Sequence, residues 1–338
     1  MKKRLSIVDI AQRVGVSTTT VSFILNGKAK EKRISDSLTK KVLDLIEEVE
    51  YKPNHLAQSL RTGKTNIICL IVEDISNPFF ANVARLIEEN AYQKGYKIVY
   101  CSTDNDVEKT RELIRVFSQR QVDGYIITAP QGIESDLKAL IDNKIPLILF
   151  DRYLSDIDSD YVIIDNYQST YQAIQHLITN GYKRIAFLSV NSDQNQMLER
   201  QAGYDAAIKN AGLENTVFKI EYRQEAPVED LKKILRENPE IDALFFATNY
   251  LAIHGLEAIN ALGLRIPEDL GIVAFDDHDI FRIYKPGITT IAQPIEEISY
   301  NLINSLLAQL DNSSTRTETS KTVLPAHLIV RGSSKSKH

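Results

Sequence analysis

The 338-residue chain has no tryptophan, two cysteines and no apolar run near the roughly 18 residues that a membrane-spanning helix needs. Cys69 and Cys101 lie in apolar segments and are too few for a disulfide framework, so we expect a reducing cytoplasm. Polar residues interrupt the basic N-terminus, MKKRLSIVDI, before any apolar run, which argues against a signal peptide. With 43% hydrophobic and 25% charged residues, the composition indicates a globular protein of about two to three domains.

Signatures of common enzyme sites are missing as well. No two of the 14 glycines are two residues apart, so the chain has no Gly-x-Gly dinucleotide fingerprint. Gly63-Lys64-Thr65 looks like the end of a phosphate loop, but Gln58 occupies the position of the first glycine of that motif. The six histidines include no pair at metal-ligand spacing, and Gly-x-Ser-x-Gly is absent. We therefore expect no catalysis, no metal and no cofactor.

The net charge of −5 combines two segments of opposite sign. Residues 1–64 carry 13 Lys and Arg against 7 Asp and Glu, a net charge of +6, which leaves −11 on residues 65–338. A small basic segment joined to a larger acidic one indicates a nucleic-acid-binding module attached to a domain with another task.

The basic segment has the pattern of a helix-turn-helix. Ser6 and Asp9 have the spacing of a capping box at the start of a first helix, which Gly15 is expected to end. Ser17 is a second candidate N-cap, and Asn26-Gly27 is expected to end the helix that follows, since both residues tolerate positive φ. Two short helices joined in this way place the second one in the DNA major groove.

Side chains of the second predicted helix are suited to contact DNA. Thr18, Thr19 and Ser22 are expected to point outward with Phe23, toward base edges, thymine methyls and phosphates. A third helix is expected after Ser35. A small helical bundle that binds protein instead of DNA is the alternative.

Three segments carry a family resemblance: SIVDIAQRVGVS at 6–17, TVS at 20–22 and EYKPNHLAQSLR at 50–61. They resemble the DNA-binding head and hinge helix of the lactose/galactose repressor (LacI/GalR) family of bacterial transcription regulators, and the similarity extends over nearly the whole chain. The resemblance implies a helix-turn-helix head, a hinge helix with its linker, and a core that binds ligand and dimerises. These domains span residues 1–53, 54–64 and 65–338.

The resemblance also implies which residues contact DNA. In this family the hinge helix orders on operator DNA and wedges a leucine between base steps of the minor groove, and Leu60 takes that position here. Phe23 stands where many members carry arginine, and the loop 27–35 is longer and contains four Lys or Arg suited to phosphate. The implied DNA-binding residues are Ser6, Ser17, Thr18, Thr19, Thr20, Ser22, Phe23, Asn26, Tyr51, Asn54, Ala57, Leu60 and Arg61.

The acidic segment alternates between short β-branched runs and amphipathic stretches, a pattern typical of parallel, doubly wound sheets. Its length predicts two such subdomains, which the resemblance likens to periplasmic binding proteins. We place one at about 65–164 and 295–323 and the other at about 165–292 and 324–332. The predicted strands are 67–72, 98–101, 125–128, 146–150, 184–189, 243–247 and 271–275, and the predicted helices include 80–94, 107–120, 170–180 and 250–262.

Polar and aromatic residues follow several of the predicted strands, where ligands bind in such folds. Carboxylates, amides and arginines can bind vicinal hydroxyls, and an aromatic face can stack on a sugar ring. Arg200 is expected to lie where a helix opens, and Tyr250 replaces the family's usual aspartate. These positions match the family's sugar-binding residues, and the candidate ligand-binding set is Asn77, Phe79, Phe80, Asp151, Arg152, Arg200, Asn249, Asp276 and Gln293.

Together these observations predict a homodimeric transcription regulator, acting as a repressor, that binds a near-palindromic operator in the cytoplasm, at the nucleoid. Its small ligand is expected to be a sugar, and a nucleoside, a purine or a sugar phosphate is the alternative. An exported solute-binding protein is disfavoured because it needs an export signal and no helix-turn-helix. The C-terminus lacks leucine heptads, which favours a dimer over a tetramer.

Overall fold

A computed structural model describes residues 5–49, 51, 63–221, 227–312 and 319–336. The chain forms two compact units, residues 1–65 and 66–338, each with a hydrophobic interior of its own. No helix in the described ranges has the length and apolar character that crossing a membrane requires.

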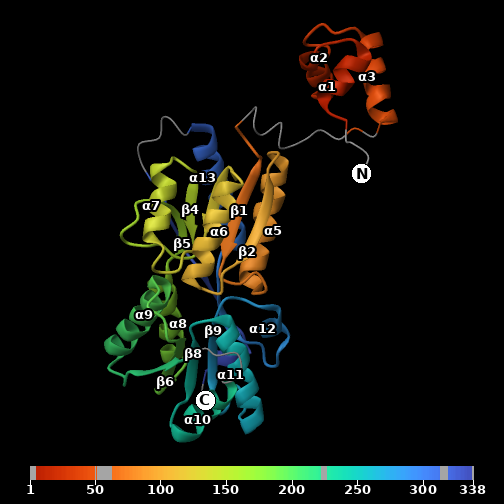
Figure 1. Ribbon diagram of the computed structural model, residues 1–338. Helices are drawn as coiled ribbons and strands as arrows, with labels where there is room; N and C mark the ends of the chain where they lie inside the picture. The colour runs from red at the N-terminus through yellow and green to blue at the C-terminus, as the bar shows by residue number, and fades with distance from the viewer. Residues whose placement is uncertain (1–4, 50, 52–62, 222–226, 313–318, 337–338) are drawn as a thin grey trace. The chain divides into compact units, whose positions relative to one another are not determined.

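The first unit is the predicted three-helix domain (Figure 1). Ser6, Ser17 and Ser35 cap its helices, and the capping box of Ser6 with Asp9 is present as expected. Gly15 ends the first helix with a φ of 78°. The helices are α1 (Ile7–Val14), α2 (Thr18–Leu25) and α3 (Asp36–Glu48).

The helices of this unit pack around a small apolar centre. Ile10, Val21 and Val42 contribute one fully buried side chain from each helix. One detail of the prediction is wrong, because Asn26 has a φ of −90° and only Gly27 adopts the left-handed conformation, with a φ of 69°. Asn26 instead ends α2 through its side chain, whose amide donates to the Ser22 carbonyl oxygen at 2.7 Å.

The second unit consists of two α/β lobes, as predicted, which lie one above the other in Figure 1. The first lobe contains a six-stranded parallel sheet in the order β11-β5-β4-β3-β1-β2. Helices α5 and α13 cover one face of the sheet, and α6 and α7 cover the other. Its elements are β1 (Ile67–Val72), α5 (Pro78–Gln93), β2 (Lys97–Ser102), α6 (Val107–Gln119), β3 (Gly124–Ile127), α7 (Glu134–Asp142), β4 (Leu147–Phe150), β5 (Asp160–Ile164), α13 (Ile295–Asn312) and β11 (Lys321–Leu324).

The second lobe repeats this plan with the sheet order β12-β10-β9-β8-β6-β7. Helices α8 and α9 pack on one face of the sheet, and α10 and α11 pack on the other. Its elements are α8 (Asn166–Thr179), β6 (Ile185–Val190), α9 (Asn195–Ala211), β7 (Thr216–Ile220), α10 (Pro227–Glu237), β8 (Ala243–Phe246), α11 (Asn249–Leu262), β9 (Gly271–Phe275), α12 (Asp279–Ile283), β10 (Thr289–Ala292), β12 (His327–Ile329) and the 3-10 turn η1 (Gly332–Ser334).

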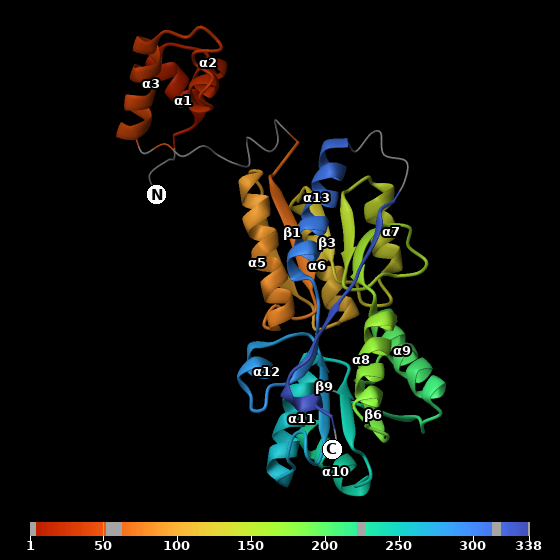
Figure 2. The ribbon, with the colours of Figure 1, turned by 180° about the vertical axis from the view of Figure 1, so that it is seen from behind.

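The chain passes between the lobes three times, after β5, after β10 and after β11. Figure 2 shows the last passage, in which the C-terminal segment runs from one lobe to the other. β12 then pairs antiparallel with β10, the one exception to the predicted parallel pairing among the described strands. Gln293 lies in the second passage, where both lobes are near.

Candidate functional site

The exposed end of α2 is the candidate DNA-contacting part of the first unit. Thr18 and Thr19 are exposed in its first turn. The Ser17 hydroxyl accepts a hydrogen bond from the Thr20 amide at 3.1 Å and lies 2.9 Å from the Thr20 hydroxyl. The side chains of Ser17 and Thr20 therefore order the helix start, and Thr18 and Thr19 are left to face outward.

The next turn of α2 is more enclosed than the sequence predicted. Ser22 and Phe23 are half-buried, and the Asn26 amide lies 3.3 Å from the Ser22 hydroxyl. The Lys32 ammonium lies 5.5 Å from the centroid of the Phe23 ring, which holds the basic loop after α2 against the helix. The four cationic residues of this loop, Lys28, Lys30, Lys32 and Arg33, are exposed.

Ser6 and Tyr51 also have structural contacts in this unit. The Ser6 hydroxyl and amide both donate to the Asp9 carboxylate at 2.7 Å. Tyr51 packs against the apolar centre of the unit, and burial raises the pKa of its hydroxyl. The remaining predicted DNA contacts, Asn54, Ala57, Leu60 and Arg61, lie outside the described residues.

A cavity of about 580 Å³ lies between the two lobes of the second unit. This volume is within the usual range for small-ligand sites, roughly 300–1,000 Å³. The cavity is lined from both lobes, largely by residues that follow the carboxyl ends of strands. It brings together Asn77, Phe79, Phe80, Asp151, Arg152, Arg200, Asp276 and Gln293 from the predicted ligand-binding set.

Phe79 and Phe80 supply the aromatic lining of this cavity, and Phe150 packs against both of them. The ring centroid of Phe79 lies 5.0 Å from that of Phe80 and 5.6 Å from that of Phe150, the last residue of β4. Phe79 and Phe80 begin α5 directly after its N-cap, Asn77. The cluster therefore joins the start of α5 to the end of β4 and offers an aromatic surface to the cavity.

Arg152 is buried among acidic and amide groups of its own lobe. Its Nε donates to Asp151 at 3.1 Å, Nη1 to Asn105 at 2.9 Å and Nη2 to Glu73 at 2.6 Å. The side chain is 2% exposed. Arg152 thus ties together the ends of β1, β2 and β4 and holds the two carboxylates in place.

Arg200 has a similar position in the second lobe. It lies in the second turn of α9, which begins at Asn195, so the prediction that it opens a helix is off by about a turn. Nε donates to Asn166 at 2.8 Å and Nη1 donates to the Ala247 carbonyl oxygen at 2.6 Å. The guanidinium stacks over the Phe275 ring at 3.5 Å. These contacts fix its orientation, and desolvation lowers the pKa of the group.

Asp151 and Asp276 occupy matching places in the two lobes. Each follows a phenylalanine at the end of a strand, and each adopts positive φ, 69° and 66° respectively. The Asp276 carboxylate accepts from the Gln293 amide at 2.6 Å. It keeps partial access to the cavity, yet burial raises its pKa, the Asp151 charge raises it further, and Arg200 and Gln293 act in the opposite direction.

Asn249 is the member of the predicted set that does not line the cavity. Its Nδ2 donates to Asn77 Oδ1 at 2.9 Å, and Asn77 Nδ2 returns a longer bond of 3.3 Å to Asn249 Oδ1. Asn77 caps α5 of the first lobe, and Asn249 begins α11 of the second. The reciprocal amide pair therefore joins the lobes, as does the bond from Gln131 Nε2 to the Asp193 carbonyl oxygen at 2.8 Å.

Sequence reasoning missed part of the cavity wall. The missed residues include Gln196 on α9 and side chains that directly follow β1, β2, β6, β7 and β8. The rule that led to Asp151 and Asp276 could have found most of them if it had been applied to every strand end. They are Glu73, Asp74, Asp104, Asn105, Asn191, Ser192, Gln194, Gln196, Met197, Glu221, Thr248 and Tyr250, with Val190 at the end of β6.

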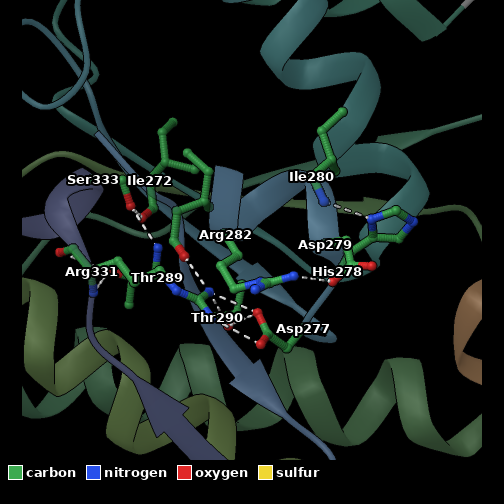
Figure 3. Close-up of polar contacts among 11 residues, drawn as sticks. Ile272, Asp277, His278, Asp279, Ile280, Arg282, Thr289, Thr290, Arg331 and Ser333 are labelled. Atoms are coloured by element: carbon green, nitrogen blue, oxygen red, sulfur yellow. Dashed lines mark hydrogen bonds and ion pairs between the residues drawn. The ribbon is translucent and has the colours of Figure 1, made fainter. Parts of the chain in front are cut away.

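Asp277 faces away from the cavity despite being next to Asp276. Figure 3 shows its carboxylate paired with the Arg331 guanidinium, at 2.7 Å for Nη1 and 2.9 Å for Nη2. The Thr290 hydroxyl adds a bond to Asp277 at 2.8 Å. These hydrogen bonds outweigh the effect of burial and lower the pKa of Asp277. Asp277 therefore attaches the C-terminal segment to β9 and β10.

Both units match known protein families. Residues 6–54 match the bacterial regulatory proteins of the lacI family, and residues 174–334 match the periplasmic binding protein-like domain. The chain is 33% identical to the HTH-type transcriptional regulator DegA of Bacillus subtilis (strain 168), with 98% of each protein covered. The chain belongs to the lacI family of bacterial transcriptional regulators. It is thus a regulator with a DNA-binding head and a ligand-binding core, and not an enzyme.

Solved structures resemble this lacI-family chain over almost its full length. The lac repressor dimer bound to operator and the anti-inducer ONPF superposes with a TM-score of 0.85 at 22% identity, covering 99% of this chain and 100% of that one. This likeness shows the fold. A complex of the transcriptional regulator CelR with cellobiose gives a TM-score of 0.71 at 25% identity, covering 98% of this chain and 100% of that one.

Proposed function

We propose that this regulator is a repressor whose affinity for operator DNA is controlled by a sugar bound between the lobes of its core. The observation that carries the proposal is the cavity of about 580 Å³, which combines the Phe79–Phe80 surface with buried polar groups from both lobes. Aromatic faces and fixed carboxylate, amide and guanidinium groups are the chemistry that sugar recognition uses. A solved relative, CelR, is complexed with the sugar cellobiose.

The head is proposed to read DNA through Thr18 and Thr19 at the exposed start of α2, with the basic loop after α2 contacting phosphate. A single head offers few contacts, so we propose that a homodimer reads two half-sites of a near-palindromic operator in the bacterial cytoplasm. Hinge residues 54–61, with Leu60 as the minor-groove wedge, are part of the same proposal.

We propose that ligand binding in the core is coupled to DNA binding by the head through the chain segment that connects them. β1 begins at Ile67, directly after the linker, so a movement of the first lobe displaces the point from which the head is tethered. A ligand that touches both lobes favours one of their arrangements, and it shifts DNA affinity only by its different affinity for the two states.

The proposal is tested by thermal-shift screening of the full-length protein against a panel of sugars, followed by operator gel shifts with and without each ligand that binds. A stabilising sugar that also changes operator affinity is the expected result. Arg200→Ala and Asp276→Ala should lose this response while still binding operator. If both variants respond like the wild type, the ligand lies elsewhere.

A further inference from the structure

The cleft contains many more negative than positive groups. Six carboxylates line it, against two guanidiniums, those of Arg152 and Arg200, and neither lysine nor histidine is among the described lining residues. The acidic residues come from both lobes, and four of them, Asp74, Asp104, Glu221 and Asp276, lie apart from the contacts of Arg152. Asp104 is paired with Lys109, which lies outside the cavity lining, at 2.7 Å. The six are Glu73, Asp74, Asp104, Asp151, Glu221 and Asp276.

The two guanidiniums are already engaged by the protein. Each nitrogen of Arg152 donates within its own lobe, to Asp151, Asn105 or Glu73. Arg200 donates a hydrogen bond from Nε to Asn166 and another from Nη1 to the Ala247 carbonyl oxygen. Paired recognition of a phosphate or carboxylate needs two parallel N–H groups of one guanidinium, and these bonds already use N–H groups of both arginines and fix the orientation of each. An anion would therefore have to compete with the protein's own acceptors for both guanidiniums.

Two buried oxygen atoms of the cavity wall have no hydrogen-bond partner. One is Oε1 of Gln196, a side chain 2% exposed, and the other is Oγ1 of Thr248, in a residue 4% exposed. The Gln196 amide nitrogen is used in a bond to Gln194 Oε1 at 3.1 Å, so Oε1 is left as an acceptor. Leaving such an atom unpaired costs free energy, about 1–3 kcal/mol in general, which a donor on a bound ligand would recover.

We propose that the cleft selects an uncharged ligand rich in hydroxyl donors, a neutral sugar or sugar alcohol, and rejects its phosphorylated or carboxylated counterparts, with Gln196 accepting from a ligand hydroxyl. The proposal rests on the assignment of this cleft as a sugar site and adds its charge preference. A hydroxyl can donate to each of the acceptors without adding charge, whereas a phosphate brings further negative charge among six carboxylates.

Matched pairs of ligands test the charge preference on the full-length protein. Thermal shift and calorimetry are run with glucose, fructose, ribose, xylose and cellobiose, each beside its monophosphate and its sugar acid. At least one neutral member should bind, with its anionic partners weaker by about 100-fold or more, which corresponds to two tenfold steps in the dissociation constant. A phosphate or acid that binds as tightly as its neutral partner overturns the charge preference but leaves the sugar site standing. Absence of binding by every compound overturns both.

Gln196→Met tests the acceptor, because methionine keeps the length and apolar body of the side chain and removes the unpaired oxygen. Affinity for the neutral sugar should fall about tenfold, while the melting temperature of the ligand-free protein should not fall. Gln168→Met, at an exposed position of α8 away from the cavity, is the matched control and should change neither. Unchanged affinity in Gln196→Met, or a loss of affinity explained by a lower melting temperature, contradicts the role of Gln196.

Discussion

Asp276 and Asp277 are adjacent residues whose charges have opposite effects on stability. Burial raises the pKa of Asp276, so the folded protein binds its proton more readily than the unfolded chain does. The ionised carboxylate therefore destabilises the core at neutral pH, and this penalty is relieved as the pH falls through the raised pKa. Asp276→Asn should raise the free energy of unfolding at pH 7 by about 1 kcal/mol, and the gain should shrink at pH 5. Thermal unfolding at both pH values measures it.

Asp277→Asn is the control, and we expect it to lower the free energy of unfolding at pH 7 where Asp276→Asn raises it. The Arg331 and Thr290 hydrogen bonds lower the pKa of Asp277, so its stabilising effect is present at neutral pH and is lost as the pH falls toward that lowered value. The pair is partly exposed, so the loss at pH 7 should be at most about 1 kcal/mol. If Asp276→Asn also melts below the wild type at pH 7, burial is not the dominant influence on Asp276.

Individual residues of the site were predictable from the sequence where they follow a recognisable apolar strand. Asp151, Asp276 and Phe79 follow apolar runs whose ends meet at the cleft, so position along the chain was enough. The inward pairing of Arg152 with Glu73 was not predictable, because the two residues are 79 positions apart and only the sheet order brings them together. Gln196 gave no sequence signal, since its importance comes from an oxygen that tertiary packing leaves unpaired.

At the scale of the element, substitutions at the start of α2 can distinguish its contribution to the stability of the head from its contribution to DNA recognition. Ser17→Ala removes the acceptor for the Thr20 amide and should destabilise the head by about 1 kcal/mol. Ser17→Asp keeps an N-cap acceptor and favourable charge at the helix start, so the head should remain as stable as the wild type. Hydrogen exchange of the α2 amides in the full-length protein measures both effects.

The order of the same two variants in operator affinity should differ from their order in helix stability. A carboxylate at position 17 repels phosphate, so Ser17→Asp should lose at least tenfold in operator affinity without any loss of helix protection. Ser17→Ala should lose affinity only as far as its helix frays. Equal operator affinity for Ser17→Asp and the wild type would place the start of α2 away from the DNA backbone.

The strands differed in how clearly the sequence predicted them. The predicted run 67–72 coincides with β1 because a strand covered on both faces is apolar throughout. Five of the described strands, β5, β7, β10, β11 and β12, were not predicted. β7, β11 and β12 lie at sheet edges and have exposed positions that break the apolar run, whereas β5 and β10 are interior strands that begin with the polar residues Asp160 and Thr289. The antiparallel direction of β12 depends on the chain crossing between lobes, which no local pattern encodes.

At the scale of the whole molecule, the charge split predicts two different responses to salt. Operator affinity should fall steeply from 50 to 200 mM salt, by roughly 10³-fold if the two heads of a dimer contact about six phosphates. Affinity for a neutral sugar in the acidic core should change little over the same range, because no ion pair forms. Fluorescence anisotropy with labelled operator and calorimetry with the sugar measure the two. Parallel falls in both affinities contradict this division.

The matching placement of Asp151 and Asp276 has a consequence for ligand polarity. Because the same Phe-Asp strand end occurs in both lobes with nearly the same backbone conformation, a ligand turned end for end meets a strand-end carboxylate on either side. Orientation must then be decided by the groups that differ between the lobes, which are the Phe79–Phe80 rings on one lobe and the Arg200 guanidinium on the other. The parts of the cleft that differ between the lobes thus determine the orientation in which a sugar binds.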